Sequence, residues 1–319
     1  MDLGGTGAAV VTPPLVAGLL DDAAMFPPGL LPLPQAVRAH AAHRTAAHSA
    51  AVGPLVVAAP ALAELREVDA GRVETSRAVP DRGAPGRADA GRAAPDGPAP
   101  LAVTVPAGPA AVPAALAELG GFPLRALEIP VPDLDPADLP DALRRVRENT
   151  DAEVYVEVPR DDRRAAVLAL LGPLGCRAKF RTGGVRADLH PGEAELAAAV
   201  HEVVRLDVPF KATAGLHHAV RNSDGFEQHG FLNILLAVDA ALRGGAVADL
   251  AAVLADRDAP GIAARVAALG EERTRELRTR FTSFGTCSVA EPLAELAALG
   301  LLPGHLATDL PAIHPGADS

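Results

Sequence analysis

The sequence predicts an α/β protein with the (β/α)8 TIM-barrel fold, in which eight parallel strands alternate with helices. Short apolar runs alternate along the chain with longer Ala/Leu-rich segments of helical period, which is the pattern of βα units. Eight of these short runs can be counted. The chain has 319 residues, of which 49% are hydrophobic, and this suffices for a single barrel domain over 1–319.

The expected strands are the short apolar runs, and the expected helices are the segments that separate most of them. The strands are expected at 15–26, 53–61, 101–107, 124–131, 153–160, 176–184, 208–218 and 281–288. The helices are expected at 34–50, 109–119, 136–149, 161–171, 192–205 and 226–243, with a last one at 288–299.

Two segments exceed the barrel plan. Residues 66–100 are rich in Pro, Gly, Arg and Asp with little to bury, so we expect a disordered, low-complexity insertion after the second strand. Replacement of Gly71 to Ala99 by a short linker should then leave folding intact. Residues 244–280 are expected to form extra helices before the last strand, as a partial cover of the barrel or a subunit contact in a homo-oligomer.

Composition limits the classes of partner and the compartment. The formal net charge is −11 and no basic stripe is present, which argues against nucleic acid. No apolar run approaches the roughly 20 residues that cross a bilayer, and the first residues lack a basic leader, so neither a membrane nor export is expected. Cys176 and Cys287 are too few for a disulfide framework, which favours a reducing cytoplasm.

The distribution of basic residues is uneven, because only two lysines, Lys179 and Lys211, occur among 29 Lys and Arg residues. Arginine would suffice for ion pairing, whereas lysine can lose its proton and act as a nucleophilic amine. The two residues fall on the sixth and seventh expected strands. Neighbouring strands lie about 4.8 Å apart, so the two amines can approach closely if they sit at similar heights. Each would then favour the neutral form of the other.

Other polar residues also fall near the carboxyl ends of expected strands, where barrels of this fold carry their chemistry. They are Asp21, Asp22, Glu128, Glu157, Arg181 and Thr213. Side chains alternate along a strand, so Lys179 and Arg181 share one face, as do Lys211 and Thr213. Because Val154, Val156 and Val158 should face the helices, Glu157 should point into the barrel. Cations and carboxylates are therefore expected to converge on one pocket.

Three strand motifs resemble those of the deoxyribose-phosphate aldolases, which are class I, Schiff-base aldolases with a (β/α)8 fold. "KFRTGG" is similar to the sixth-strand motif whose lysine forms the imine, which implies that role for Lys179 and a match at Thr182 and Gly183. "KATAG" is similar to the seventh-strand motif, which implies that Lys211 lowers the pKa of the first lysine and that Gly215 lies at a phosphate-binding turn.

The eighth-strand "FGTCS" resembles a Phe-Gly-x-Ser-Ser motif, with Cys287 where a serine is expected. "VEVP" around Glu157 also resembles the family's fifth strand, and Glu128 stands where the family has an aspartate that shuttles protons. A glycine of the phosphate-binding turn is replaced by Leu216, followed by His217 and His218. The identity of the substrate is therefore left open, and the substrate need not carry a phosphate.

The leading interpretation is a lyase of the EC 4.1.2 type that makes or breaks a C–C bond in a small, anionic carbonyl substrate, without a metal or cofactor. The expected catalytic residues are Lys179, Lys211, Glu128, Glu157 and His217. The expected substrate contacts are Asp21, Asp22, Arg181, Thr182, Gly183, Gly184, Thr213, Gly215, His218, Gly285 and Ser288.

Three alternatives remain open at this point. His217, His218 and His229 with nearby carboxylates could bind a metal in a hydrolase or isomerase. Lys179, Arg181 and Lys211 could bind a small anion without catalysis, or the charges could form a buried ion-pair network. Two further groups are not expected to take part in function. Cys287 is expected to be a small buried hydrophobic residue. The histidines of the first helix, His40, His43 and His48, are expected to lie on a solvated face.

Overall fold

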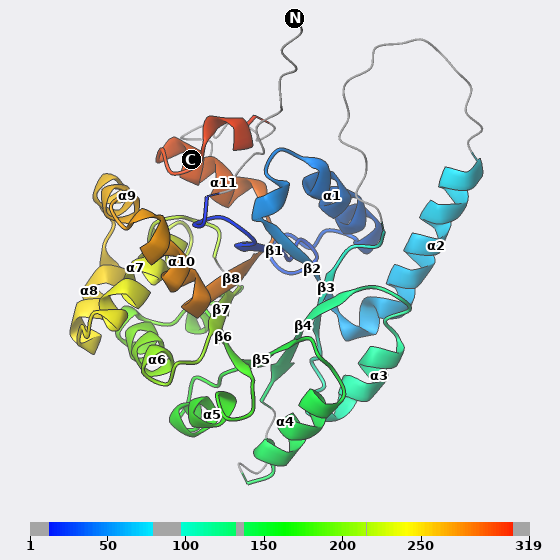
Figure 1. Ribbon diagram of the computed structural model, residues 1–319, viewed down its shortest axis with the longest axis horizontal. Helices are drawn as coiled ribbons and strands as arrows, with labels where there is room; N and C mark the ends of the chain where they lie inside the picture. The colour runs from blue at the N-terminus through cyan, green and yellow to red at the C-terminus, as the bar shows by residue number, and fades with distance from the viewer. Residues whose placement is uncertain (1–12, 79–96, 132–136, 215, 309–319) are drawn as a thin grey trace, which may run out of the picture.

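The computed structural model describes residues 13–78, 97–131, 137–214 and 216–308. Eight parallel strands close into a barrel in the order of the sequence, and helices surround it (Figure 1). The strands are β1 (Leu20–Asp22), β2 (Val52–Ala58), β3 (Leu101–Thr104), β4 (Leu124–Pro130), β5 (Glu153–Glu157), β6 (Arg177–Arg181), β7 (Phe210–Thr213) and β8 (Phe281–Thr286). The predicted TIM-barrel fold is confirmed.

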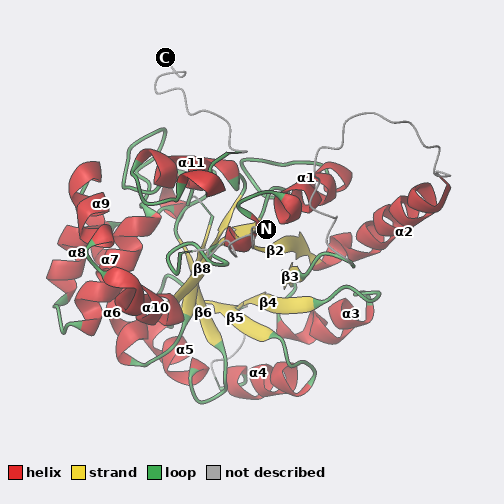
Figure 2. Ribbon diagram, turned by 45° about the horizontal axis from the view of Figure 1, so that its top comes forward, coloured by secondary structure: helices red, strands yellow, loops and turns green. Residues whose placement is uncertain are grey.

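The helices cover the outside of the barrel, as the separate colours of strand and helix show in Figure 2. They are α1 (Leu33–Thr45), α2 (Leu62–Ala78), α3 (Val112–Ala117), α4 (Leu139–Glu148), α5 (Arg164–Leu171), α6 (Glu193–Arg205), α7 (Phe231–Leu242), α8 (Val247–Ala255), α9 (Ala259–Ala267), α10 (Gly270–Arg280) and α11 (Ala290–Ala298). The expected extra helices before the last strand are α8, α9 and α10. They pack against α6 and α7 and thicken that side of the wall.

The prediction that 66–100 lacks a fold is wrong for its first part, which belongs to α2. Leu62 and Leu65 are buried one helical turn apart and anchor this helix to the core. The exposed Arg66 and Glu67 contribute to the polar composition of the segment, and Arg66 pairs with Glu118 near α3. Residues 79–96 lie outside the described part of the chain.

Two groups of buried apolar residues build the barrel. The large core lies between strands and helices and includes Val154 and Val156 of β5. Since side chains alternate along a strand, the residues between them face the lumen. The lumen holds a second, small apolar group, formed by Val56, Ala102, Ala126 and Tyr155. These four lie on β2 to β5, so the opposite side of the lumen is left to polar residues.

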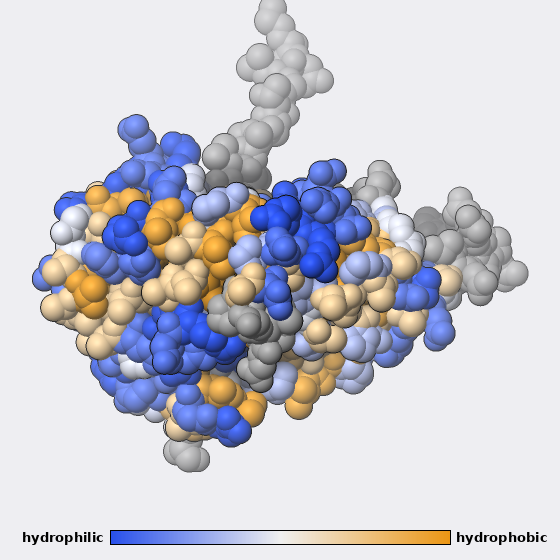
Figure 3. Space-filling view, turned by 90° about the horizontal axis from the view of Figure 1, so that it is seen from below, coloured by the Kyte–Doolittle hydropathy of each residue, from blue (hydrophilic) through white to orange (hydrophobic). Residues whose placement is uncertain are grey.

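The surface is mixed in character. Figure 3 shows polar and apolar residues interspersed over one face of the molecule. Within the described residues, no helix has both the length and the apolar character needed to span a membrane.

Candidate active site

The barrel has a cavity at each mouth. The upper cavity, of about 470 Å³, lies at the carboxyl ends of the strands, and its walls include Glu157, Arg181 and Thr213 from the ends of β5, β6 and β7. The lower cavity, of about 740 Å³, lies at the amino ends, and its walls include Glu153 and Arg177 from the starts of β5 and β6. The lumen between them contains the chain's two lysines.

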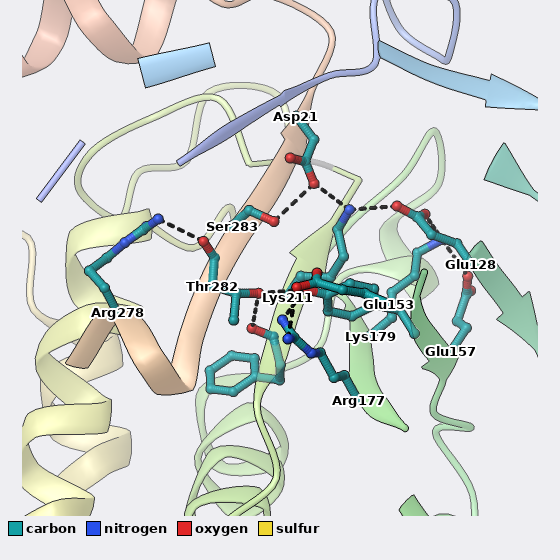
Figure 4. Close-up of polar contacts among 12 residues, drawn as sticks. Asp21, Glu128, Glu153, Glu157, Arg177, Lys179, Lys211, Arg278, Thr282 and Ser283 are labelled. Carbon is teal, nitrogen blue, oxygen red and sulfur yellow. Dashed lines mark hydrogen bonds and ion pairs between the residues drawn. The ribbon is translucent and has the colours of Figure 1, made fainter. Parts of the chain in front are cut away.

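Lys179 and Lys211 stand opposite each other in the register of β6 and β7. The condition of similar height is therefore met. Both bind the carboxylate of Glu128 on β4: Lys179 Nζ lies 2.8 Å from Oε2, and Lys211 Nζ donates to Oε1. One carboxylate thus lies between two ammonium groups in the buried lumen (Figure 4).

Each lysine has a second carboxylate partner, and these partners lie toward different mouths. Lys179 Nζ lies 3.1 Å from Glu157 Oε2, and both residues line the upper cavity. Lys211 donates to Asp21 of β1, which also accepts a 2.9 Å hydrogen bond from the hydroxyl of Ser283 on β8. Lys211 and Asp21 line the lower cavity. The expectation that both lysines open on one pocket is therefore wrong, although they share Glu128.

The buried charges shift one another's pKa values. Burial alone would raise the pKa of Glu128, but the charges and hydrogen bonds of Lys179 and Lys211 lower it to about 2. Burial would lower the pKa of Lys211, yet Asp21 and Glu128 together raise it, so this lysine remains protonated. For Asp21 burial prevails over Lys211 and the pKa is raised. Glu157 is less buried, and Lys179 and Arg181 lower its pKa.

Eight predicted site residues line the upper cavity. They are Glu128, Glu157, Lys179, Arg181, Gly184, Thr213, His217 and Gly285. Arg181 Nε donates to Glu157 Oε1 over 3.1 Å, and within the described residues no hydrogen-bond partner is found for its terminal nitrogens. The terminal nitrogens of Arg181 can therefore bind a ligand in the upper cavity, which Lys179 also lines.

Several predicted substrate contacts have other partners. Asp22 points away from the lumen and accepts a 3.0 Å hydrogen bond from His40 of α1, because successive side chains of a strand alternate. The hydroxyl of Thr182 donates to the carbonyl of Ala214 over 2.9 Å. The hydroxyl of Ser288 accepts the backbone N–H of Glu291 over 3.3 Å. Gly183 is buried without lining the cavity, and Gly215 lies outside the described residues.

The histidines expected as possible metal ligands are bound to protein groups. His217 Nδ1 lies 3.2 Å from Glu291 and His218 Nδ1 lies 2.6 Å from Glu295, both on α11. His229 Nε2 lies 2.8 Å from the carbonyl of Pro191, and burial lowers its pKa to about 4. In the part of the chain that the structure describes, no group of three or more His, Cys, Asp and Glu side chains is arranged to hold a metal ion.

Some residues of the lumen and its surroundings were missed from the sequence. Tyr155 donates to Glu153 over 2.9 Å and accepts from Arg177 over 3.1 Å, which forms a polar network at the lower mouth. Its ring lies 5.3 Å from Lys211 Nζ, which adds a cation–π contact. The expectation of a solvated histidine face is wrong for His40 and His48, which are buried. Side-chain alternation puts Tyr155 on the same face as Glu157, but no sequence pattern predicts its contacts with Glu153 and Arg177.

His217 should make stability depend on pH. Burial would lower its pKa, but Cys287 and Glu291 raise it from 6.5 to about 9. Because the folded-state value is the higher one, protonation stabilises the fold fully below pH 6.5, and this contribution is lost as the pH rises to about 9. The free energy of unfolding, measured by urea denaturation, should lose about 3 kcal/mol over this window. His217→Gln should abolish that loss, and an unchanged slope in the variant would contradict the assignment.

Comparison with known proteins adds no assignment. No protein-family model matches the chain, and a search of curated proteins gives no match.

Proposed function

We propose that this protein is a class I, aldolase-like lyase in which Lys179 forms a Schiff base with a small carbonyl substrate. The observation that carries the proposal is the lysine pair: two lysines in register share the carboxylate of Glu128, and only Lys179 opens on the upper cavity. The similarity of the β6, β7 and β8 motifs to those of deoxyribose-phosphate aldolases supports the same assignment.

The carboxylates around Lys179 suit an iminium ion. In the resting site the Lys179 ammonium is paired with Glu128 and Glu157. When the amine attacks a carbonyl carbon, a C–N bond forms and the oxygen leaves as water, so the nitrogen carries the same single positive charge as before. Glu128 and Glu157 therefore have the same counter-charge in the iminium as in the resting site.

The two glutamates have different tasks in this scheme. Glu128 is held between two lysines with a pKa of about 2, so it stays ionised and stabilises the cation. Glu157 is on the cavity wall with a side chain that is 23% exposed, and it takes the Lys179 proton and returns it to the leaving oxygen. During cleavage the electrons of the C–C bond move into the iminium, which becomes an enamine, while a base accepts the proton of the substrate hydroxyl.

The cavity also indicates the kind of substrate. Its volume of about 470 Å³ suits a small molecule. The terminal nitrogens of Arg181 lie on the same wall as Lys179, so an anionic group on the substrate would bind there with its carbonyl toward the amine. His217 also lines the cavity, and with a pKa of about 9 it is protonated at neutral pH and can supply a proton to a substrate oxygen.

Reductive trapping tests the proposal. Sodium borohydride, added together with acetaldehyde, acetone or pyruvate in turn, should increase the mass of the folded protein by one adduct with at least one of these probes. Lys179→Arg keeps the positive charge and removes the nucleophile, so this variant should gain no adduct. An equal adduct on the variant, or none on the wild-type protein with any carbonyl compound that it turns over, would refute the Schiff-base mechanism.

A further inference from the structure

Cys287 lies immediately beyond β8 on the wall of the upper cavity, and it belongs to a chain of three reactive groups. Its Sγ is 3.5 Å from His217 Nε2, and His217 Nδ1 is in turn 3.2 Å from Glu291 Oε2. Cys287 and His217 both line the cavity, whereas Glu291 is not among its lining residues and has a side chain that is 59% exposed. The three residues come from the loop after β7, the end of β8 and the first turn of α11.

The arrangement satisfies the geometry of an activated nucleophile. A nucleophile of this kind needs a base within reach and a third group that orients the base. Glu291 contacts Nδ1 of the His217 ring. The sulfur of Cys287 lies beside the same ring, 3.5 Å from Nε2 and 3.8 Å from Nδ1. His217 has these two partners and is buried, so its ring is held in this orientation.

The surroundings of the sulfur are positively charged. Glu291 and Cys287 raise the pKa of His217 to about 9, against the effect of burial, so the imidazole is a cation at neutral pH. Helix α11 begins at Ala290, three residues beyond Cys287, and places its positive end near the thiol. Thiols beside a cationic imidazole or a helix N-terminus are the reactive ones in proteins.

The other cysteine provides a contrast within the same chain. Cys176 is buried against the carbonyl of Leu174, and burial raises its pKa to about 11. It has no histidine partner among the described residues and does not line the upper cavity. Only Cys287 combines an open face with a base.

We propose that Cys287, activated by His217 and oriented through Glu291, is a second nucleophile of the upper cavity that adds reversibly to small aldehydes. The thiolate sulfur forms a bond to the carbonyl carbon, the π electrons of the carbonyl move to oxygen, and His217 supplies the proton that this oxygen takes. The product is a thiohemiacetal, and the reverse sequence releases the aldehyde. No oxidant or cofactor is required for this step.

The same cavity wall holds Lys179, so the inference gives the proposed lyase a place for its aldehyde partner. This extension rests on the proposed function, whereas the reactivity of Cys287 does not. A carbonyl compound bound to Lys179 and an aldehyde held at Cys287 would occupy one cavity of about 470 Å³. Failure of one reaction can be told apart from failure of the other, because Lys179→Arg leaves the three residues of the thiol site unchanged.

Alkylation by iodoacetamide at pH 7, followed by peptide mass analysis, tests the proposal. Cys287 should be alkylated at least about 10-fold faster in the wild-type protein than in His217→Gln. Glu291→Gln should give a smaller loss because that carboxylate is largely exposed. His218→Gln is the matched control, since His218 is adjacent in sequence but binds Glu295, and it should leave the rate unchanged.

Two further measurements complete the test. Acetaldehyde should protect Cys287 from alkylation in both the wild-type protein and Lys179→Arg, whereas acetone, a poorer electrophile, should protect much less. At pH 7 the wild-type protein should show ultraviolet absorbance from a thiolate that Cys287→Ser lacks. This measurement can be made even if the His217 variant does not fold. Absence of that difference, or equal alkylation in His217→Gln, would overturn the activated thiol; absence of protection by acetaldehyde would overturn the aldehyde site.

Discussion

Lys211→Met is expected to lower the free energy of unfolding by about 3–5 kcal/mol, because the change leaves the buried Asp21 without its counter-charge and removes one of the two lysine partners of Glu128. Lys211 is 1% exposed and binds both Asp21 and Glu128. Methionine fills a similar volume but cannot compensate either charge, and the Ser283 hydroxyl alone cannot stabilise Asp21. Urea denaturation at pH 7 measures the effect.

The pH dependence and a double variant distinguish this cause from a packing defect. The folded-state pKa of Asp21 is already raised, and without Lys211 it should rise further, so the variant should regain stability relative to the wild-type protein as the pH falls from 7 to about 5. Asp21→Asn combined with Lys211→Met should recover part of the loss, since one stranded charge is removed. A loss below about 1 kcal/mol at pH 7 would show that the ion-pair network does not support the lumen.

Glu157→Gln is expected to slow imine formation at Lys179 by about 100- to 10,000-fold, the usual contribution of a general acid–base group. Glutamine keeps the shape of the side chain and can still contact Arg181, but it cannot accept the Lys179 proton. The rate is measured as the growth of the borohydride-trapped adduct with time, using the carbonyl probe that gives an adduct with the wild-type protein.

Glu153→Gln is the matched control for this experiment. Glu153 lies on β5 like Glu157, and its side chain is on the same face of the strand. It is at the other end of the strand, however, where it binds Arg177 and Tyr155 at the lower mouth. The control variant should trap the probe at the wild-type rate. Equal rates for Glu157→Gln and the wild-type protein would exclude Glu157 as the group that moves the proton.

Much of the fold followed from local pattern. The apolar runs located all eight strands, and side-chain alternation placed Lys179, Glu157 and Arg181 on one inward face, as the structure has them. Alternation also predicts that only one of Asp21 and Asp22 points into the lumen, and in the structure that residue is Asp21. Helix α2 was missed because its buried Leu62 and Leu65 precede residue 66, and the described residues of the helix beyond them are mostly polar, with Val68 packed against the core.

The direction of the Lys211 side chain and the contact of Cys287 with His217 depend on residues that are far apart in the sequence. Alternation predicts that Lys211 faces the lumen, but the direction of its flexible stem is decided by Asp21, which is 190 residues away. The contact between Cys287 and His217 spans 70 residues and requires the loop after β7 to meet the start of α11. Neither arrangement has a local sequence pattern, because each is set by the closure of the barrel.

In the proposed mechanism Lys179, and not Lys211, is the amine that forms the Schiff base. Since these are the only two lysines, peptide mapping after borohydride trapping assigns the adduct without ambiguity once the N-terminal amine is mapped as well. The mechanism predicts the adduct on Lys179 in the wild-type protein and its loss in Lys179→Arg. An adduct on Lys211 alone would reverse the assignment, and no adduct on either lysine with any carbonyl compound that the protein turns over would contradict the lyase mechanism.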